Sequence, residues 1–166
     1  EAGASIFEHV RVTGVERSRV STDAGVIDAD VVVDASGMTG INLLGSPRTP
    51  PRDICAAAQW VYKLADRDEG LAFLDRYGCR EHDTVCFSGV EGGYSILNVQ
   101  IDGDEVALLS GTIPGEGYRS GQRLIDDFVA EHRFIGEPIF GGKRPIPLGR
   151  PHVELARGQH AAIGDA

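Results

Sequence analysis

The sequence predicts an α+β fold: an antiparallel sheet with two helices, flanked at both ends of the chain by strands of a second, α/β-type unit. Three observations support this prediction. Alternating apolar segments fill the middle of the chain, and two segments with capping residues are typical of helices. The third is a β-branched run, Val31–Val33, which leads into a turn at Ala35, Ser36 and Gly37. Such a run is typical of a strand buried on both faces of a parallel sheet.

The first 28 residues predict short antiparallel strands. Residues 5–8 have the composition of a short strand, and residues 10–16 alternate between valine and polar side chains. A turn at residues 23–25 joins two further short strands, at residues 20–22 and 26–28, as a hairpin. A small meander therefore leads into the β-branched run.

The central segment predicts the main sheet and both helices. Residues 43–52 carry three prolines and form a connection. Residues 54–64 are ambiguous, because three alanines favour a helix whereas a period of two favours a strand; we favour the strand. The remaining elements are a helix at 66–77 capped by Asp66, strands at 84–88, 94–101 and 105–112, and an amphipathic helix at 121–133 with Leu124, Ile125, Phe128 and Val129 facing inward. Beyond residue 133 we expect extended chain punctuated by Gly and Pro, and then a short strand at Ala161–Ile163.

Composition narrows the class of protein. The 166 residues suit one domain, or one domain and a small part of another, and 42% hydrophobic with 25% charged residues is typical of globular proteins. A formal net charge of −9 argues against a nucleic-acid-binding surface. No apolar run approaches the roughly 20 residues that span a bilayer, so we expect no transmembrane segment.

The cysteines and histidines predict neither disulfides nor metal. Cys55, Cys79 and Cys86 form no C-x-x-C pair, which favours a reducing compartment and a role as small core residues. The five histidines are scattered without metal-ligand spacing, so we expect no metal site. The expected location is the cytoplasm, with peripheral attachment to a membrane left open.

A glycine pattern between a predicted strand and a predicted helix allows a nucleotide-binding reading. Gly115, Gly117 and Gly121 have a spacing similar to a dinucleotide fingerprint. Against this reading, Pro114 stands in the turn and the preceding strands form a hairpin rather than a βαβ unit. An NAD(P)-binding module and a plain loop both remain alternatives for this segment.

Several segments together resemble FAD-dependent oxidoreductases. The segments are Val-Val-Val-Asp-Ala-Ser-Gly at 31–37, Arg-Pro-Ile-Pro-Leu-Gly at 144–149 and Ala-Ala-Ile-Gly-Asp-Ala at 161–166, separated by an antiparallel α+β insert. More narrowly, the chain resembles the geranylgeranyl reductase family, which shares the fold of p-hydroxybenzoate hydroxylase. Gly92-Gly93-Tyr94-Ser95 is similar to the Gly-Gly-Tyr that begins a strand of the substrate domain in those reductases.

The resemblance implies a domain division and a cofactor. Residues 1–45 would form part of an FAD-binding domain, residues 46–151 a substrate-binding domain of the p-hydroxybenzoate hydroxylase type, and residues 152–166 a return strand of the FAD-binding domain. FAD would contact Ala35, Ser36 and Gly37 through its ADP half, and Gly164 and Asp165 near its ribityl and pyrophosphate region. Tyr94 and Trp60 would lie on the substrate side; no catalytic residue is assigned.

Three departures from the family pattern qualify this implication. The N-terminal Gly-x-Gly-x-x-Gly unit with its βαβ motif, which holds the ADP moiety in the family, is absent and would lie upstream of Glu1, so we expect a fragment that binds FAD weakly or not at all. The sequence also ends at Asp165-Ala166, where the family continues into a helix that faces the pyrophosphate. Ser36 stands where aromatic hydroxylases carry an Asp, and Ile96 and Leu97 follow where the reductases have an aromatic residue and a Pro.

The expected function is flavin-mediated hydride transfer to or from a small or isoprenoid-like substrate, with an electron-transfer partner. The alternative is a non-enzymatic domain that binds an apolar small ligand or a protein on its antiparallel sheet. The alternative requires no cofactor.

Overall fold

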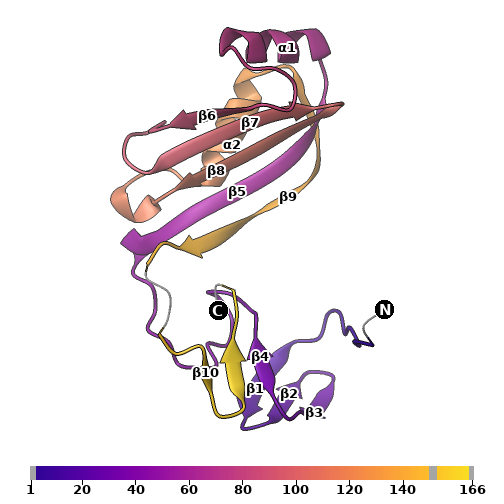
Figure 1. Ribbon diagram of the computed structural model, residues 1–166, viewed down its shortest axis with the longest axis vertical. Helices are drawn as coiled ribbons and strands as arrows, with labels where there is room; N and C mark the ends of the chain where they lie inside the picture. The colour runs from indigo at the N-terminus through magenta and orange to yellow at the C-terminus, as the bar shows by residue number, and fades with distance from the viewer. Residues whose placement is uncertain (1–2, 150–152, 165–166) are drawn as a thin grey trace. The chain divides into compact units, whose positions relative to one another are not determined.

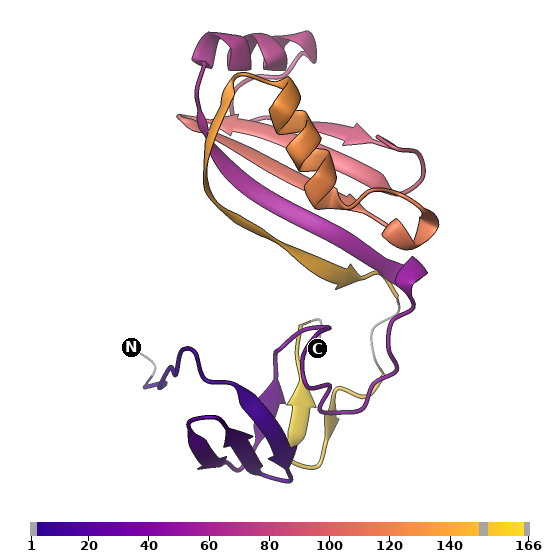
Figure 2. The same cartoon turned by 180° about the vertical axis from the view of Figure 1, so that it is seen from behind.

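The computed structural model describes residues 3–149 and 153–164, and its contacts divide the chain into two compact units. Unit 1 consists of Glu1–Arg48 and Arg150–Ala166, and unit 2 consists of Thr49–Gly149. Figures 1 and 2 show each unit from two sides. The structure confirms the mixed α+β class, with antiparallel sheets and two helices.

Unit 1 contains two three-stranded sheets. Its first sheet is the predicted meander, with the order β1-β2-β3, antiparallel throughout; the strands are β1 (Val12–Glu16), β2 (Arg19–Thr22) and β3 (Gly25–Asp28). Its second sheet has the order β10-β11-β4, from β4 (Val32–Asp34), β10 (Ala156–Arg157) and β11 (His160–Ala162). The strand predicted at residues 5–8 is wrong, because those residues join no sheet.

The β-branched run forms a parallel strand, as predicted. β4 pairs in parallel with β11, with Val33 opposite Ala161 and Asp34 opposite Ala162. The predicted burial on both faces is wrong for the described chain, since Val31 is 60% exposed and Val33 is 51% exposed.

Unit 2 is a five-stranded antiparallel sheet with the order β6-β7-β8-β5-β9. Its strands are β5 (Ile54–Leu64), β6 (Thr84–Ser88), β7 (Ser95–Asp102), β8 (Glu105–Thr112) and β9 (Ile135–Pro147). The alanine-rich segment is the strand β5, because its alternating side chains pair on both sides, with β8 and with β9. β8 and β9 both run antiparallel to β5, so they are parallel to each other and α2 (Gly121–Glu131) connects them across β5.

The largest difference from the sequence-based prediction is the strand β9. The glycines and prolines of residues 135–147 favoured extended chain outside the sheet, yet this segment is a strand of 13 residues. β9 pairs only with β5 and forms an edge of the sheet, and an edge strand tolerates prolines because half of its N–H groups face away from the ladder.

Both helices follow their sequence signals. α1 (Arg67–Arg76) begins after Asp66, whose side chain accepts a hydrogen bond from the Glu69 amide, and Gly78 follows the helix with a φ of 67°. α2 packs against one face of the sheet, over β8, β5 and β7 (Figure 2). Leu124 and Ile125 are buried there, and Phe128 and Val129 are partly buried against the same core, as predicted.

The core of unit 2 lies between α2 and the sheet. Val99, Ile101, Val106 and Leu108 are fully buried on the face of β7 and β8 that α2 covers. No described element of unit 2 covers the other face, which we call the open face (Figure 1). The three cysteines differ: Cys55 is buried and Cys79 packs against the core, whereas Cys86 is exposed on β6, so the core prediction is wrong for Cys86.

Candidate functional site

The open face carries the alternate side chains of the five strands. Across β7, β8, β5 and β9, one row of cross-strand partners is Ile96, Gly111, Ala57 and Arg144. The next row is Asn98, Leu109, Gln59 and Gly142. Directly opposed residues on antiparallel strands share a face, so these rows point away from α2.

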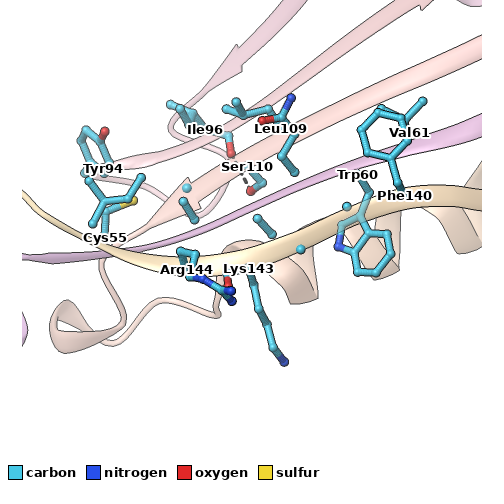
Figure 3. Close-up of a pocket in the computed structure, with 17 residues that line it drawn as sticks. Cys55, Trp60, Val61, Tyr94, Ile96, Leu109, Ser110, Phe140, Lys143 and Arg144 are labelled. Carbon is cyan, nitrogen blue, oxygen red and sulfur yellow. Dashed lines mark hydrogen bonds between the residues drawn. The ribbon is translucent and has the colours of Figure 1, made fainter. Parts of the chain in front are cut away.

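A hollow of about 670 Å³ lies on this face, which is within the usual size of small-molecule sites, about 300–1,000 Å³. Three lining residues have small or no side chains and define what we call its floor: Ala57, Gly111 and Gly142. Figure 3 shows larger side chains that line the hollow, among them Tyr94, Ile96 and Leu109. The full lining is Cys55, Ala57, Ala58, Gln59, Trp60, Val61, Tyr94, Ile96, Leu109, Ser110, Gly111, Phe140, Gly141, Gly142, Lys143, Arg144 and Ile146.

Close packing requires glycine at two positions that line the hollow, whereas a third glycine borders open space. A Cβ at Gly111 would lie 2.9 Å from Cys55 Sγ, and a Cβ at Gly141 would lie 2.4 Å from the Gln59 carbonyl oxygen. A Cβ at Gly142 would meet no atom within 4 Å. Gly142 therefore keeps the hollow open, and a larger side chain there would fill it.

Cys55 closes one end of the hollow as a neutral thiol. The residue is 4% exposed, and burial raises the pKa of the thiol, which the hydrogen bond from the Thr112 amide opposes in part. A thiol with a raised pKa is a poor nucleophile at neutral pH. Cys55 therefore contributes apolar surface.

Tyr94 reaches the hollow from a glycine-rich loop between β6 and β7. Gly89, Gly92 and Gly93 all have positive φ angles, which lets the loop turn tightly. Glu91 fixes the loop to the segment before α2, because its carboxylate accepts hydrogen bonds from the amide and the guanidinium of Arg119. Tyr94 is 44% exposed, so its ring is accessible to a ligand.

Trp60 touches the hollow at its margin, but its side chain lies on the other face. Its indole Nε1 donates a 2.8 Å hydrogen bond to Gln122 Oε1 on α2. Figure 3 shows Trp60 and Lys143 extending to the opposite side of the strands from Val61 and Leu109. A ligand on the open face would therefore meet Tyr94 directly and Trp60 only at its backbone.

A smaller polar hollow of about 180 Å³ adjoins the first and shares Gln59 and Leu109 with it. Thr84, Asn98 and Gln100 supply its polar groups. Asn98 Oδ1 is buried without a hydrogen-bond partner in the structure. The open face thus offers an apolar compartment beside an amide-lined one.

In unit 1, the turn after β4 is organised by the buried carboxylate of Asp34. Asp34 is 4% exposed; it accepts hydrogen bonds from the Ser36 amide (3.0 Å), the Ser36 hydroxyl and the Leu43 amide (3.1 Å). Burial raises the pKa of Asp34, but these three hydrogen bonds together outweigh it and lower the pKa below its ordinary value. The Ser36 hydroxyl is therefore engaged within the turn.

The parallel pairing of β4 with β11 places the segments that follow these two strands next to each other. The Ile163 amide donates a 2.9 Å hydrogen bond to the Asp34 carbonyl, so Gly164 follows β11 where Ala35, Ser36 and Gly37 follow β4. Gly37 and Gly164 have φ angles of 72° and 70°, and a Cβ at either would meet no atom within 4 Å. A ligand could approach both backbones closely. Asp165 lies outside the described residues.

The glycines of the nucleotide-binding reading have packing roles in unit 2. A Cβ at Gly121 would lie 2.6 Å from the Ala56 carbonyl oxygen, and one at Gly115 would lie 2.6 Å from the Pro51 carbonyl oxygen. Gly117 ends the short 3₁₀ turn Pro114–Glu116 with a φ of 95°. The approach of α2 to the sheet accounts for Gly121, contact with Pro51 accounts for Gly115, and the positive φ accounts for Gly117.

Other site classes receive no support from the described part of the chain. Within residues 3–149 and 153–164, no three His, Cys, Asp or Glu side chains gather as metal ligands. Among the same residues, no helix has both the length and the apolar character needed to cross a bilayer.

Comparison with known proteins places the fold. No protein-family model matches the chain, and no curated protein matches it. Among solved structures, a geranylgeranyl bacteriochlorophyll reductase-like protein from Thermoplasma acidophilum matches 96% of this chain and 39% of its own, with a TM-score of 0.60 and 16% identity. A tryptophan 6-halogenase from Streptomyces toxytricini matches 94% of this chain and 30% of its own, with a TM-score of 0.57 and 18% identity.

A flavin-dependent halogenase from Brevundimonas sp. BAL3 matches 93% of this chain and 31% of its own, with a TM-score of 0.53 and 19% identity. The chain therefore shares its fold with part of a reductase-like protein and of two halogenases, and it spans well under half the length of each.

The sequence reading missed several residues of the hollow. Three of them, Phe140, Gly142 and Arg144, belong to β9, for which the sequence predicts extended chain outside the sheet. Of the four positions on that face of β9, only Phe140 and Ile146 are apolar, so the segment lacks the alternation of apolar and polar residues that is typical of a strand. The role of Asp34 was also missed, although an Asp two residues before a Ser at a strand end is typical of a side-chain-capped turn.

Proposed function

We propose that this chain provides the substrate-binding domain and part of the FAD-binding domain of a FAD-dependent oxidoreductase of the geranylgeranyl reductase type. The observation that carries the proposal is the apolar hollow on the open face, within a fold shared with a reductase-like protein and a flavin-dependent halogenase. The chain spans 39% of the length of the first of these, so activity and cofactor binding are proposed for a larger protein.

In this proposal the open face of unit 2 binds the substrate. Ile96, Leu109 and Phe140 supply apolar contact, and the low floor at Ala57, Gly111 and Gly142 admits an isoprenoid-like or flat apolar group. Burial of apolar ligand surface contributes roughly 25 cal/mol per Å².

Unit 1 would contribute to the cofactor site at the end of β4 and β11. Ala35, Ser36 and Gly37 would approach the ADP half of FAD, and Gly164 with Asp165 its ribityl or pyrophosphate region. The open backbones at Gly37 and Gly164 fit this role, whereas the Ser36 hydroxyl is already bound to Asp34. A bound flavin would supply hydride transfer, and these residues would only hold it.

Geranylgeraniol tests the substrate site. Isothermal titration calorimetry of the 166-residue chain with geranylgeraniol should show a saturable heat change, because the hollow offers the ligand an apolar site. Gly142→Leu should abolish the change, because its Cβ would meet no atom within 4 Å and the added side chain would occupy the hollow. Gly149→Leu is the matched control, since a Cβ there also meets no atom within 4 Å and the residue does not line the hollow. Equal binding by the two variants would contradict the site.

Hydrogen exchange tests the cofactor role, because it detects weak binding. We expect ADP at about 1 mM, a concentration at which even fragment-strength binding with a Kd near 1 mM half-fills a site, to slow exchange at residues 35–37. Riboflavin at the same concentration should leave those amides unchanged. No protection by ADP or FAD at residues 35–37 or at Gly164 would count against a cofactor role for unit 1.

The second candidate is a non-enzymatic domain that binds an apolar ligand. It is favoured by one observation: every residue that lines the hollow belongs to unit 2. It predicts geranylgeraniol binding without any FAD or ADP protection in unit 1. The two experiments above therefore separate the candidates.

A further inference from the structure

The charged side chains that line the hollow are all cationic. Among the described residues, the charged side chains that line it are Lys143 and Arg144, and no Asp or Glu lines it. This is unexpected in a chain with a formal net charge of −9. A cationic margin on an acidic protein attracts anions only at short range, because salt screens charges beyond about 10 Å.

The strand register separates the two cations. Arg144 pairs with Ala57 in the row that forms the floor of the hollow, whereas Lys143 pairs with Ala58, whose side chain faces α2. Figure 3 shows Lys143 extending away from the side of Val61 and Leu109. The register therefore places Arg144 in the row of the floor, and Figure 3 shows its guanidinium beside β9, near the Lys143 carbonyl oxygen, at the margin of the hollow.

The guanidinium of Arg144 has no carboxylate partner within the described chain. Its one hydrogen bond there runs from Nη1 to the Lys143 carbonyl oxygen, at 3.0 Å. By contrast, Arg67 and Arg119 are bound by Glu81 and Glu91. A free guanidinium retains several N–H donors in the fork geometry that binds carboxylate, sulfonate or phosphate oxygens in pairs.

Two acidic residues of the open face, Asp102 and Glu105, lie at its far end. Glu105 pairs with Lys63 and with Asp102, whereas the floor residue Gly111 lies six residues further along β8. At about 3.4 Å per residue, that end is roughly 20 Å away. An anion beside Arg144 would therefore meet little repulsion from these carboxylates.

We propose that the hollow selects apolar ligands that carry an anionic group, and that Arg144 binds this group at the margin of the floor. The inference rests on the proposed substrate role of the hollow and adds the chemical class of the substrate. The apolar part occupies the space above Ala57, Gly111 and Gly142, and the anion lies at β9.

Two dyes with the same ring skeleton test the proposal. 8-Anilinonaphthalene-1-sulfonate carries a sulfonate, and N-phenyl-1-naphthylamine is its uncharged counterpart; both fluoresce on entering an apolar site. The component of each signal that Gly142→Leu removes reports binding in the hollow. We expect the sulfonate to bind about fivefold more tightly than the neutral dye, with the preference shrinking as salt is raised.

Arg144→Gln should abolish this preference and leave the affinity for the neutral dye unchanged. Arg133→Gln, at another exposed arginine of unit 2 outside the hollow, is the matched control and should preserve the preference. Lys143→Gln should have the smaller effect of the two lining cations. Circular dichroism checks that each variant is folded.

The outcomes distinguish a failure of the proposed function from a failure of the proposed anionic class of ligand. If neither dye shows a component sensitive to Gly142→Leu, the hollow is not a ligand site and the proposed function loses its support. If both dyes bind there equally, or if Arg144→Gln acts no more strongly than Arg133→Gln, the hollow remains a ligand site but the anionic class is overturned.

Discussion

Trp60 on β5 and Gln122 on α2 are joined by a 2.8 Å hydrogen bond from the indole Nε1 to the amide Oε1. This contact links α2 to β5 on the face of the sheet opposite the hollow. β5 also supplies several of the residues that line the hollow. The substitution Gln122→Leu removes the acceptor and leaves the part-buried indole N–H unpaired. We expect a loss of about 1 kcal/mol in the free energy of unfolding, or roughly 4–8 °C in the midpoint for a domain of this size.

Thermal unfolding followed by circular dichroism and by Trp60 emission measures this loss. Gln122 also donates a 2.8 Å hydrogen bond from Nε2 to Asp126 Oδ1, so the control is Asp126→Ala, which removes that second contact and keeps the acceptor of the indole. If the two variants unfold at the same temperature, the hydrogen bond does not stabilise the contact between α2 and β5.

Gly121 determines how closely α2 approaches the sheet. In Gly121→Ala the new Cβ would lie 2.6 Å from the Ala56 carbonyl oxygen and 2.9 Å from that of Ser110, and neither backbone atom can move freely. We expect a destabilisation of about 1–3 kcal/mol, as for other overpacked positions. Gly149→Ala should cost far less, because its Cβ enters open space.

The same pair tests the nucleotide-binding alternative. If the glycines serve packing alone, NAD⁺ or NADP⁺ should not shift the unfolding temperature of the unsubstituted chain. A saturable shift that Gly121→Ala abolishes would revive that alternative. Gly117→Val is a poorer test, since the φ of 95° strains any β-branched residue there.

Local signals predicted the elements whose partners lie nearby in sequence. The Asp66 cap, the hairpin of β7 and β8 and the amphipathic face of α2 all depend on neighbouring residues, and the structure confirms them. β9 could not be recognised in the same way, because its prolines are acceptable only at a sheet edge, and the edge is determined by pairing with β5.

The hollow depends on the same long-range pairing. Arg144 and Ala57 are neighbours only because β9 pairs with β5 in one register, and a shift by one residue would place Lys143 on the open face instead. The family resemblance implied that Tyr94 and Trp60 lie on the substrate side; both border the hollow, but the sequence could not show that the Trp60 indole lies on the other face of the sheet. The shared fold of low-identity proteins was recognisable from short motifs alone.

The contact between Glu91 and Arg119 is expected to hold the loop that carries Tyr94. Glu91→Gln removes the charge from the acceptor of the Arg119 guanidinium and amide. We expect hydrogen exchange at residues 89–94 to accelerate by roughly twofold to fivefold, the effect of a surface ion pair. Glu105→Gln is the control, because this exposed carboxylate forms no ion pair among the described residues.

The same contact should respond to acid. The hydrogen bond from Arg119 lowers the pKa of Glu91, against a smaller effect of desolvation. A lowered pKa in the folded state means that the contribution is complete above the ordinary Glu value of 4.5 and is lost as pH falls through the folded pKa. If exchange in the loop, corrected for intrinsic rates, is the same at neutral pH and at a pH below the folded pKa of Glu91, the contact with Arg119 does not hold the loop.

Asp34 should be the most sensitive position of unit 1. Asp34→Asn replaces a buried carboxylate that accepts hydrogen bonds at both oxygens with an amide, whose single oxygen accepts from either Ser36 or Leu43 while its N–H groups face the donors of the other. We expect about 2 kcal/mol of local destabilisation, read as faster hydrogen exchange at the Ser36 and Leu43 amides. Asp30→Asn, at an exposed residue before β4, should leave these amides unchanged.

The pH dependence of Asp34 provides a second reading of the same relationship. Burial raises its pKa, but the hydrogen bonds from Ser36 and Leu43 lower it further, so the folded pKa lies below the ordinary 3.8. Its contribution is therefore complete above 3.8 and declines as pH falls through the folded value. Protection at Ser36 and Leu43 should persist at neutral pH and fall only in strong acid, and in Asp34→Asn this acid step should be absent. An acid step of equal size in Asp34→Asn would assign the transition to another group and remove Asp34 as the organiser of the turn.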